Sequence, residues 1–295
     1  MKKIVLFLQN RNFLGAQIVH IPLLNALKEA YPNSTITIFS KHKISGILKE
    51  LQLVDKIIFE REKIEIIKDY INEKADITIL LRSKSLFLNL LVGISNRNIK
   101  IGFENSVSKL FFTKTKKTNP KIYRANNYLA LIDKKSDNLQ NSINNTIIII
   151  PGAGGDEKIW DINNYIKLSQ LLKESHASQE IIFILGKKEE SYMDILKENH
   201  QNYLFELNIK DLSHIIYEAK LVIANDCGPS HFAQIHNQNF LILYTNDDGN
   251  AETIIKEWFN KKENSYPIKS AKFTTINSIK STEVFQFIEN RHLLK

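Results

Sequence analysis

Residues 221–244, LVIANDCGPSHFAQIHNQNFLILY, contain a complete strand, turn, short helix and second strand. An apolar run precedes the turn, and a second apolar run from Phe240 to Tyr244 closes the stretch. Pro229 suits the first turn of a helix, where a missing N–H costs nothing. Ligands of open parallel sheets bind beyond the carboxyl ends of the strands. The stretch therefore predicts a parallel α/β sheet with a binding site at residues 225–231.

The same alternation of strand-like and helix-like segments extends along most of the chain. We expect a strand at residues 3–8, a helix at 15–30 kinked by Pro22, and further strands at 35–39, 56–59, 77–81 and 99–103. Residues 104–145 lose the alternation, apart from a helix at 124–131, and residues 146–155, TIIIIPGAGG, begin it again. This pattern predicts two α/β domains, residues 1–140 and 141–295. The final helix, at about 282–292, is a candidate to pack back on the first domain.

Composition limits the class of protein. The chain has 295 residues, of which 43% are hydrophobic and 24% charged, enough for two domains with real cores. A single cysteine, Cys227, excludes an internal disulfide framework and a cysteine-rich zinc site. The first apolar run ends at Leu8, which is too short for a signal peptide, and the run at 86–94 is half the length of a membrane span. We expect a cytoplasmic protein.

The net charge of +8 calls for an anionic partner. Residues 109–124, KLFFTKTKKTNPKIYR, contain six cations and no acid, with Phe111 and Phe112 among them. Two interpretations stay open: a solvated loop with a few anchoring aromatics, or peripheral contact with an anionic membrane such as the inner membrane. We expect no nucleic-acid partner.

Three strand ends of the second half place glycine beside charged residues. In PGAGGDEK, residues 151–158, the glycines let backbone amides approach an anion and Lys158 adds a point charge. LGKKEE, residues 185–190, ends another strand, and the turn after Asn225 is the third. Neither the dinucleotide-binding nor the P-loop motif is present. The three turns together predict an anion-binding edge of the second sheet.

In this order and at these separations, PGAGGDEKIWDINNYIKLSQLL, FILGKKEE and LVIANDCGPSHFAQ resemble the donor-binding half of glycosyltransferase family 9, the heptosyltransferases. FLGAQIVHIPLLNALKEAYPNSTITIF, residues 13–39, resembles the opening strand, helix and strand of that family. The resemblance covers most of the chain, and its most specific element is Asp-x-Gly-Pro-x-His. It implies a GT-B type fold, in which two Rossmann-like domains face each other across a cleft. The first domain would bind the acceptor and the second the nucleotide sugar.

The resemblance also implies an activity: inverting transfer of heptose from ADP-heptose to a lipopolysaccharide, glycolipid or oligosaccharide acceptor. It implies no cofactor and no metal, because protein cations and helix N-termini offset the charge of the leaving diphosphate. Lys158 would neutralise the diphosphate, and Asp226 would orient the sugar or the turn. Glu189 would accept from the ribose hydroxyls, with Glu190 as the alternative register. The implied donor site is Ala153, Gly154, Lys158, Gly186, Glu189, Asp226, Cys227, Gly228 and His231, and the implied acceptor site is Arg11, Asn12 and Gly15.

Structural roles are the alternatives at several of these positions. Asp226 is also a favourable N-cap, and His231 is equally a buried helix residue. Trp160 fits a packing role better than that of a platform for the base.

One position departs from the family pattern. Ala16 occupies the place of the aspartate that acts as general base in the family, and loss of a general base typically costs about 10²- to 10⁴-fold in rate. His20, one helical turn further on, is the nearest titratable candidate for the role, with a packing histidine as the alternative. Two other functions therefore stay open: a non-catalytic homologue that binds nucleotide sugars or glycans, and a sugar-nucleotide epimerase on the same fold.

Overall fold

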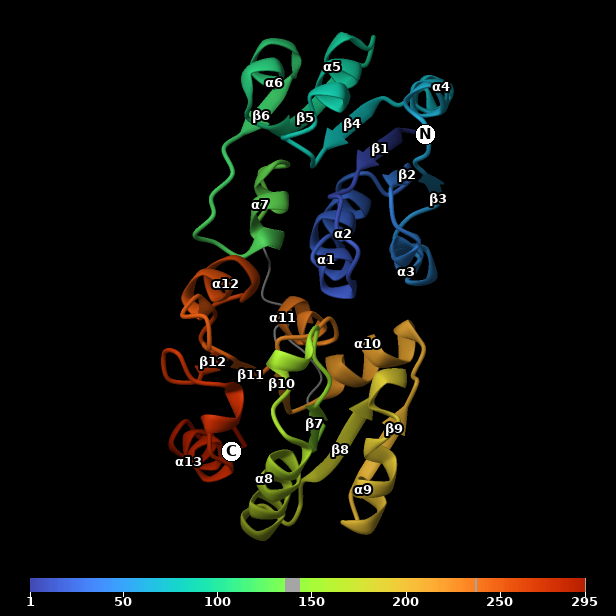
Figure 1. The fold of residues 1–295 in the computed structure, drawn as a ribbon. Coiled ribbons are helices and arrows are strands. Elements are labelled where there is room, and N and C mark those ends of the chain that lie inside the picture. Colours follow the sequence, from blue (N-terminus) through green and yellow to red (C-terminus); the bar gives the residue numbers. More distant parts are fainter. Residues whose placement is uncertain (136–143, 237, 295) are drawn as a thin grey trace. The chain divides into compact units, whose positions relative to one another are not determined.

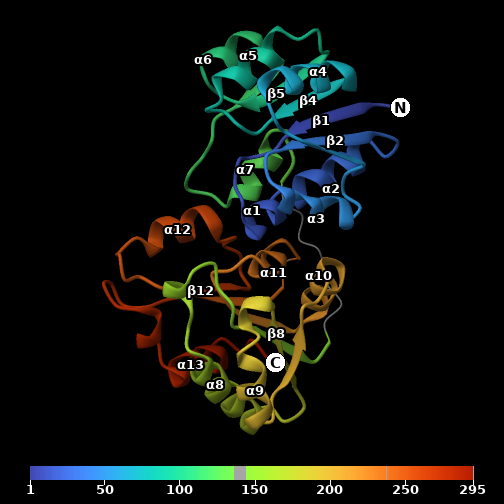
Figure 2. The ribbon, with the colours of Figure 1, turned by 45° about the vertical axis from the view of Figure 1, so that its right-hand side comes forward.

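The computed structural model describes residues 1–135, 144–236 and 238–294. The chain divides into two compact units, Met1–Asp137 and Asn138–Lys295. The predicted boundary between residues 140 and 141 lies outside the described residues. Each unit is a parallel six-stranded sheet covered by helices on both faces (Figures 1 and 2). The predicted fold class is confirmed.

In the first unit the strand order is β3-β2-β1-β4-β5-β6. The central strand β1 lies between β2 and β4, and its residue Val5 pairs with Thr37 and Thr78. The chain therefore turns to opposite sides of β1, which makes the carboxyl ends of β1 and β4 the topological switch point where α/β sheets bind ligands. The strands are β1 Lys3–Phe7, β2 Thr35–Ser40, β3 Lys56–Phe59, β4 Ile77–Leu80, β5 Ile99–Phe103 and β6 Lys114–Lys116.

The helices of the first unit form two layers (Figure 2). One layer contains α1 Leu14–Ile18, α2 Ile21–Ala30, α3 Ile47–Glu50 with the preceding 3₁₀ turn η1 Lys43–Gly46, and α7 Arg124–Ala130. The other contains α4 Lys63–Glu73, α5 Leu86–Ile94 and α6 Ser106–Phe111.

The kinked helix expected at residues 15–30 is two helices, separated at Val19 and His20. A proline ring clashes with the carbonyl four residues earlier, and for Pro22 that residue is Ile18, where α1 ends. Pro22 itself is the second residue of α2, a position that needs no backbone N–H.

The second unit repeats the arrangement with the strand order β12-β11-β10-β7-β8-β9. Strand β7 pairs with β10 on one side, Ile148 with Val222, and with β8 on the other, Ile148 with Ile182. The switch point therefore lies between β7 and β10, and the ends of β8, β7 and β10 are neighbours. The strands are β7 Thr146–Ile150, β8 Glu180–Leu185, β9 Asn202–Phe205, β10 Leu221–Asn225, β11 Phe240–Tyr244 and β12 Ser265–Lys269.

The helices of the second unit include the last one of the chain, α13, which packs against α8. Val284 and Ile288 of α13 are fully buried in the core of this unit. Ser281 Oγ donates to the carbonyl of Asn164 at 2.9 Å, and His176 Nε2 lies 2.5 Å from Glu289 Oε1. The helices and 3₁₀ turns are η2 Asp156–Lys158, α8 Ile162–Ser175, η3 Lys187–Glu189, α9 Tyr192–Glu198, α10 Ile209–Glu218, α11 Ser230–His236, α12 Ala251–Trp258, η4 Ile276–Ser278 and α13 Ser281–Asn290.

Within the described residues, the structure contains no helix of the length and apolar character that crossing a membrane requires.

Candidate active site

The three predicted turns of the second unit meet at one edge of its sheet. Residues 151–158 follow β7, residues 186–189 follow β8, and residues 226–229 follow β10. Because these strands are parallel neighbours, their carboxyl ends lie at the same edge. The fold thus brings together three sequence segments that are separated by up to about 70 positions, and it does so at the switch point.

Lys158 and Asp226 form an ion pair at this edge. Lys158 Nζ lies 2.7 Å from Asp226 Oδ2, and their side chains are 28% and 15% exposed. The Gly154 amide points toward the backbone carbonyl of Asp226 at 3.5 Å. An ammonium group has three N–H donors, so the contact with Asp226 leaves others for a phosphate. The carboxylate of Asp226 therefore positions Lys158, a role that the sequence did not assign to it.

Asn225 joins the loops of the site. It lies within the predicted binding stretch 225–231, but no role of its own was predicted for this residue. Its side chain is fully buried, and its Nδ2 donates to the carbonyl of Pro151 at 2.7 Å. Its Oδ1 accepts from the Tyr165 hydroxyl at 2.8 Å and from the Trp160 amide at 3.4 Å. One side chain thus joins the end of β10 to the loop after β7 and to α8. The available signal was a polar residue that ends an otherwise apolar buried strand.

Trp160 has the packing role that we favoured from the sequence. Its side chain is fully buried, its ring meets that of Tyr165 edge to face at 4.7 Å, and its indole N–H donates to the carbonyl of Ile279 at 3.0 Å.

Glu189 lies beside the glycines of two loops. Its Oε2 accepts from the Gly186 amide at 3.0 Å, and a Cβ added to Gly152 would lie 2.7 Å from its Oε1. Partial burial raises the pKa of this carboxyl. A side chain at position 152 would therefore displace the Glu189 carboxylate from its present place. Glu190 is exposed, so of the two carboxylates Glu189 is the one that the structure holds beside the glycine loops.

His231 and Cys227 are buried parts of the turn after β10. The His231 ring meets that of Trp258 edge to face at 5.8 Å, and its Nδ1 lies 3.0 Å from Gln234 Nε2. Burial lowers the pKa of His231 to about 4 and raises that of the Cys227 thiol to about 12. Both side chains are thus neutral near pH 7, and the geometry of His231 fits the alternative of a buried helix residue. Ser230 Oγ donates to the carbonyl of Cys227 at 2.8 Å, which fixes the turn at Gly228.

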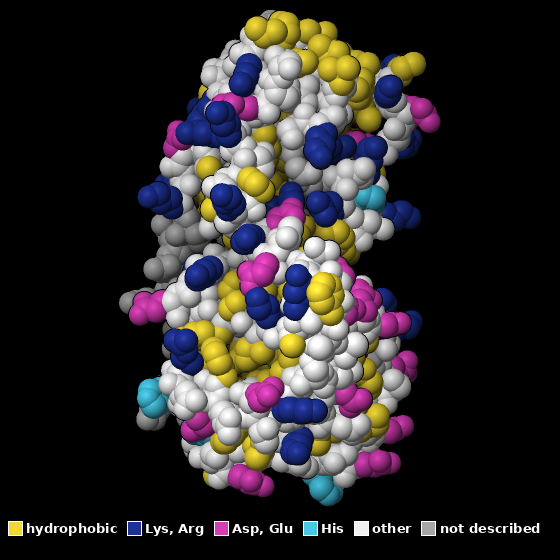
Figure 3. Space-filling model, turned by 60° about the vertical axis from the view of Figure 1, so that its left-hand side comes forward, with side chains coloured by type: hydrophobic (Ala, Val, Ile, Leu, Met, Phe, Trp, Pro, Cys, Tyr) yellow, Lys and Arg dark blue, Asp and Glu magenta, His cyan; other side chains and the backbone are white. Residues whose placement is uncertain are grey.

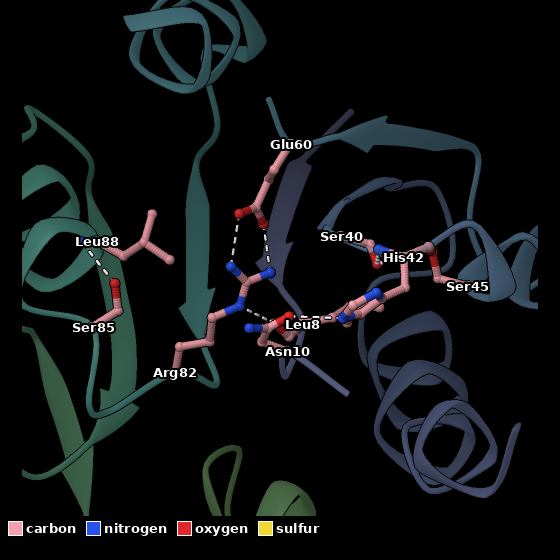
Figure 4. Close-up of polar contacts among 9 residues, drawn as sticks. All are labelled: Leu8, Asn10, Ser40, His42, Ser45, Glu60, Arg82, Ser85 and Leu88. Carbon is pink, nitrogen blue, oxygen red and sulfur yellow. Dashed lines mark hydrogen bonds and ion pairs between the residues drawn. The ribbon is translucent and has the colours of Figure 1, made fainter. Parts of the chain in front are cut away.

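The corresponding edge of the first unit contains a buried ion pair (Figure 4). The guanidinium of Arg82 binds Glu60 through two parallel contacts, Nη1 to Oε2 at 2.7 Å and Nη2 to Oε1 at 2.5 Å, and its Nε donates to the carbonyl of Leu8. The side chains are 8% and 1% exposed. Such a pair tolerates burial only because the donors and acceptors are matched. Arg82 thereby links the ends of β1, β3 and β4, and both residues could have been noticed as charges that directly follow strands.

The predicted acceptor residues lie around this edge. Arg11 is partly buried, and burial together with the nearby charge of Arg124 lowers its pKa. Asn12 is exposed, and Gly15 is buried in α1. Asn10 Oδ1 and His42 Nε2 lie 2.7 Å apart and extend the polar edge toward β2 (Figure 4). Neither residue was predicted from the sequence.

Ala16 and His20 lie on the helical layer next to this edge. Ala16 is buried within α1. His20 is fully buried between α1 and α2, its ring stacks in parallel on that of Tyr128 at 5.0 Å, and its Nδ1 lies 3.3 Å from the carbonyl of Gln17. Burial lowers the pKa of His20 to about 3, far below the range of an effective base at neutral pH. The geometry therefore favours packing over proton transfer for His20.

Replacement of His20 with asparagine is expected to lower the melting temperature and to leave any turnover per folded molecule near that of the parent. The unfolded chain protonates His20 at a pKa of about 6.5, whereas the folded chain keeps it neutral down to about 3. The contribution of neutral His20 to the free energy of unfolding is therefore fully present above about pH 6.5. As the pH falls below that value, the free energy of unfolding decreases by about 1.4 kcal/mol per pH unit.

Melting curves at pH 7.5 and 5.5 check this: the acid-induced loss of stability should be smaller in the variant than in the parent. Complete loss of turnover in a fully folded variant would instead assign His20 a part in catalysis.

Comparison with known proteins places this arrangement in a family. The sequence profile of glycosyltransferase family 9 (heptosyltransferase) matches residues 73–257. A search of curated proteins gives no significant match.

Solved structures resemble the whole chain. The ADP-heptose lipopolysaccharide heptosyltransferase II of Escherichia coli has a TM-score of 0.70 at 17% identity, covering 100% of this chain and 99% of its own. A family 9 glycosyl transferase from Veillonella parvula gives 0.71 at 16% identity, with 100% and 98% covered. An E. coli heptosyltransferase with ADP-2-deoxy-2-fluoro heptose gives 0.68 at 15% identity, with 97% and 99% covered. These matches show that the two units have the GT-B fold of heptosyltransferases, and the match to the family profile shows that the chain belongs to glycosyltransferase family 9.

Proposed function

We propose that the protein transfers heptose from ADP-heptose to a lipopolysaccharide or related surface-glycan acceptor. The observation that carries the proposal is the Lys158–Asp226 pair at the switch point of the second sheet, one strand away from the Glu189 carboxylate. A cation for a diphosphate and a carboxylate for ribose hydroxyls are the two groups that a nucleotide sugar requires. The solved relative with an ADP-heptose analogue supports the choice of ADP-heptose as donor.

In this proposal the second unit binds the donor. Lys158 neutralises the diphosphate through the N–H donors that Asp226 leaves available. Glu189 accepts hydrogen bonds from the ribose, and the amides of residues 227, 228 and 230 lie near the phosphates. The negative charge that develops on the leaving ADP is offset by the protein cation, so the transfer needs no metal ion.

The first unit binds the acceptor. Arg11 and Asn12 lie after β1, and burial together with the nearby charge of Arg124 lowers the pKa of Arg11. Such a concentration of positive charge attracts an anionic glycolipid. An acceptor hydroxyl attacks the anomeric carbon from the face opposite to ADP. The new C–O bond forms as the bond to the diphosphate oxygen breaks, with inversion, and the hydroxyl proton passes to a base.

The alanine at position 16 affects only the transfer of the hydroxyl proton to a base. Without a carboxylate at position 16, water is left to take the proton, and transfer is slow rather than absent. The rival function, a non-catalytic homologue, shares the donor site but gives no turnover. An epimerase would change the sugar without any acceptor.

Measurements of binding and product separate these functions. In a thermal-shift series of ADP-, UDP- and GDP-sugars, ADP-heptose is expected to raise the melting temperature most, and Glu189→Gln to weaken that response. Product analysis with and without a heptose-deficient lipopolysaccharide acceptor then tests for transfer. Binding without transfer at high enzyme concentration would support the non-catalytic homologue. A folded protein that responds to no nucleotide sugar would contradict the proposal.

A further inference from the structure

Helix α5 carries large apolar side chains on its outward face. Leu86, Leu90 and Ile94 are four residues apart, so they follow one another along one side of the helix. They are 65%, 41% and 73% exposed, whereas Leu88 and Val92 on the opposite side are buried in the core. The inner face alone accounts for packing on the sheet, which leaves the outer face without a structural role in the unit.

Helix α6 continues this surface. Leu110 and Phe111 are 79% and 44% exposed. The two helices touch, because a Cβ added to Gly93 of α5 would lie 3.1 Å from Phe111 Cβ. We name these five side chains the apolar ridge: Leu86, Leu90, Ile94, Leu110 and Phe111.

The ridge is a local concentration of exposed apolar surface. Among the residues that the structure describes, eleven large hydrophobic side chains are exposed, and seven of them lie on α4, α5 and α6. The two on α4 are Ile64 and Ile71. Figure 3 shows hydrophobic side chains gathered at the end of the first unit that contains α5 and α6, at the top of the view, with lysines and arginines beside them. Single exposed apolar residues are ordinary, but a contiguous group marks an interaction surface.

The part of the chain that contains the ridge is basic. Residues 81–130, which include α5 and α6, contain ten Lys and Arg residues and a single acid, Glu104, and so have a net charge of +9, against +8 for the whole chain. Lys84 and Lys109 next to the ridge are exposed, and Lys109 Nζ lies 3.5 Å from Glu104 Oε2 at the surface. Apolar side chains rimmed by lysines on one face are the combination that binds the headgroup region of anionic bilayers.

The structure narrows the basic segment that the sequence singled out at residues 109–124. Phe112 packs inward over β5, since a Cβ added to Gly102 would lie 2.7 Å from its Cε2. Lys116 pairs with Asp133 at 2.9 Å, and Lys114 pairs with the same carboxylate. The contribution of this segment to an outward surface therefore centres on residues 109–111.

We propose that the apolar ridge, with Lys84 and Lys109, docks the protein on an anionic phospholipid bilayer, with the apolar side chains at headgroup depth. Docking needs neither donor nor turnover, so it stands independently of the glycosyl transfer proposed above. The first residue of the ridge, Leu86, follows Arg82 by four positions, so the ridge begins near the carboxyl edge of the first sheet.

Sedimentation with large unilamellar vesicles tests the proposal on the full chain. The parent should bind vesicles of phosphatidylcholine with about a third phosphatidylglycerol, and binding should weaken as salt rises through the physiological range, where the Debye length is about 8 Å. Binding to pure phosphatidylcholine should be at least tenfold weaker. Equal binding to both vesicles would overturn the proposal.

Two sets of variants separate the apolar and the charged contributions. Leu86→Ser/Leu90→Ser/Ile94→Ser should lower the partition onto anionic vesicles at least tenfold, whereas Phe273→Ser, which removes a side chain that is 69% exposed in the second unit, should leave it unchanged. Lys84→Gln/Lys109→Gln should lower it about fivefold per lysine, since each cation contributes about 1 kcal/mol. The control Lys49→Gln/Lys210→Gln removes two exposed lysines elsewhere and should have little effect.

Tryptophan fluorescence measures how deeply the ridge enters the bilayer. It tests the proposal even if the triple variant folds poorly. In Leu110→Trp, fluorescence should shift to the blue on anionic vesicles and should be quenched by brominated lipids, unlike in Phe273→Trp. A parent that is dimeric in solution and becomes monomeric in the triple variant would assign the ridge to a second copy of the chain and overturn membrane docking.

Discussion

Replacement of Lys158 with methionine is expected to lower kcat/KM for the nucleotide sugar about 10²- to 10³-fold and to change stability little. The variant loses a charged contact with the diphosphate, worth about 1.5–3 kcal/mol. It also leaves the carboxylate of Asp226, whose side chain is only 15% exposed, facing the phosphates without its partner. The two effects act in the same direction because both disfavour an anion at this edge. Isothermal titration with the donor and initial-rate kinetics measure the change, and Lys167→Met, an exposed lysine on α8, is the matched control.

The double variant Lys158→Met/Asp226→Asn distinguishes two roles of Asp226. If the aspartate acts by holding Lys158, removing its charge relieves the repulsion, and the double variant binds donor better than Lys158→Met alone. If the aspartate contacts the sugar directly, the second substitution weakens binding further. Donor affinity of Lys158→Met equal to that of the parent would show that the diphosphate binds elsewhere.

Replacement of Ala16 with aspartate is expected to raise the rate of transfer about 10²- to 10⁴-fold, the usual contribution of a general base. Position 16 lies in the first turn of α1, where the positive end of the helix favours a negative charge. The gain should appear in kcat, because the base acts on the acceptor hydroxyl during reaction, with donor affinity nearly unchanged. Single-turnover kinetics with a lipopolysaccharide acceptor measure it.

Ala16→Asn is the control, because it has the shape of aspartate but accepts no proton at neutral pH. Since Ala16 is only 2% exposed, both variants should melt below the parent, and rates are compared per folded molecule. An equal gain in both variants, or none in the aspartate variant, would contradict the assignment of the base to this position.

The central strands could be predicted from the sequence because they are buried on both faces. The expected strands at residues 35–39 and 77–81 match β2 and β4 to within one residue, and the run at 146–150 becomes β7. Edge elements carry a weaker signal. β6 has three residues, KTK, and β12 contains Pro267, which a strand tolerates when only one side of it is paired. Neither of these strands was predicted from the sequence, and neither were the short helices α6 and α12.

Some residues of the candidate site could be predicted from the sequence, whereas the contacts between them could not. The strand-end turns show Lys158, Glu189 and Asp226 in the sequence, because glycine and charge interrupt apolar runs there. Lys158 and Asp226 are 68 positions apart in the sequence. Hydrophobic periodicity predicts strands and helices, but it does not predict which lysine pairs with which aspartate. The Arg82–Glu60 pair could not be predicted either, because each residue alone looks like a surface charge. Two strands, β2 and β1, separate β3 from β4 in the sheet, so only the side-chain geometry shows that the two groups meet.

The buried amide of Asn225 bears on the entropy of donor binding. Its hydrogen bonds to Pro151, Trp160 and Tyr165 immobilise the donor loops before any ligand arrives. A loop ordered in advance loses little conformational freedom on association, so more of the interaction energy with the diphosphate is available as affinity. Asn225→Ala should therefore weaken donor binding mainly through a less favourable entropy, although Asn225 itself lies behind the loops, away from solvent.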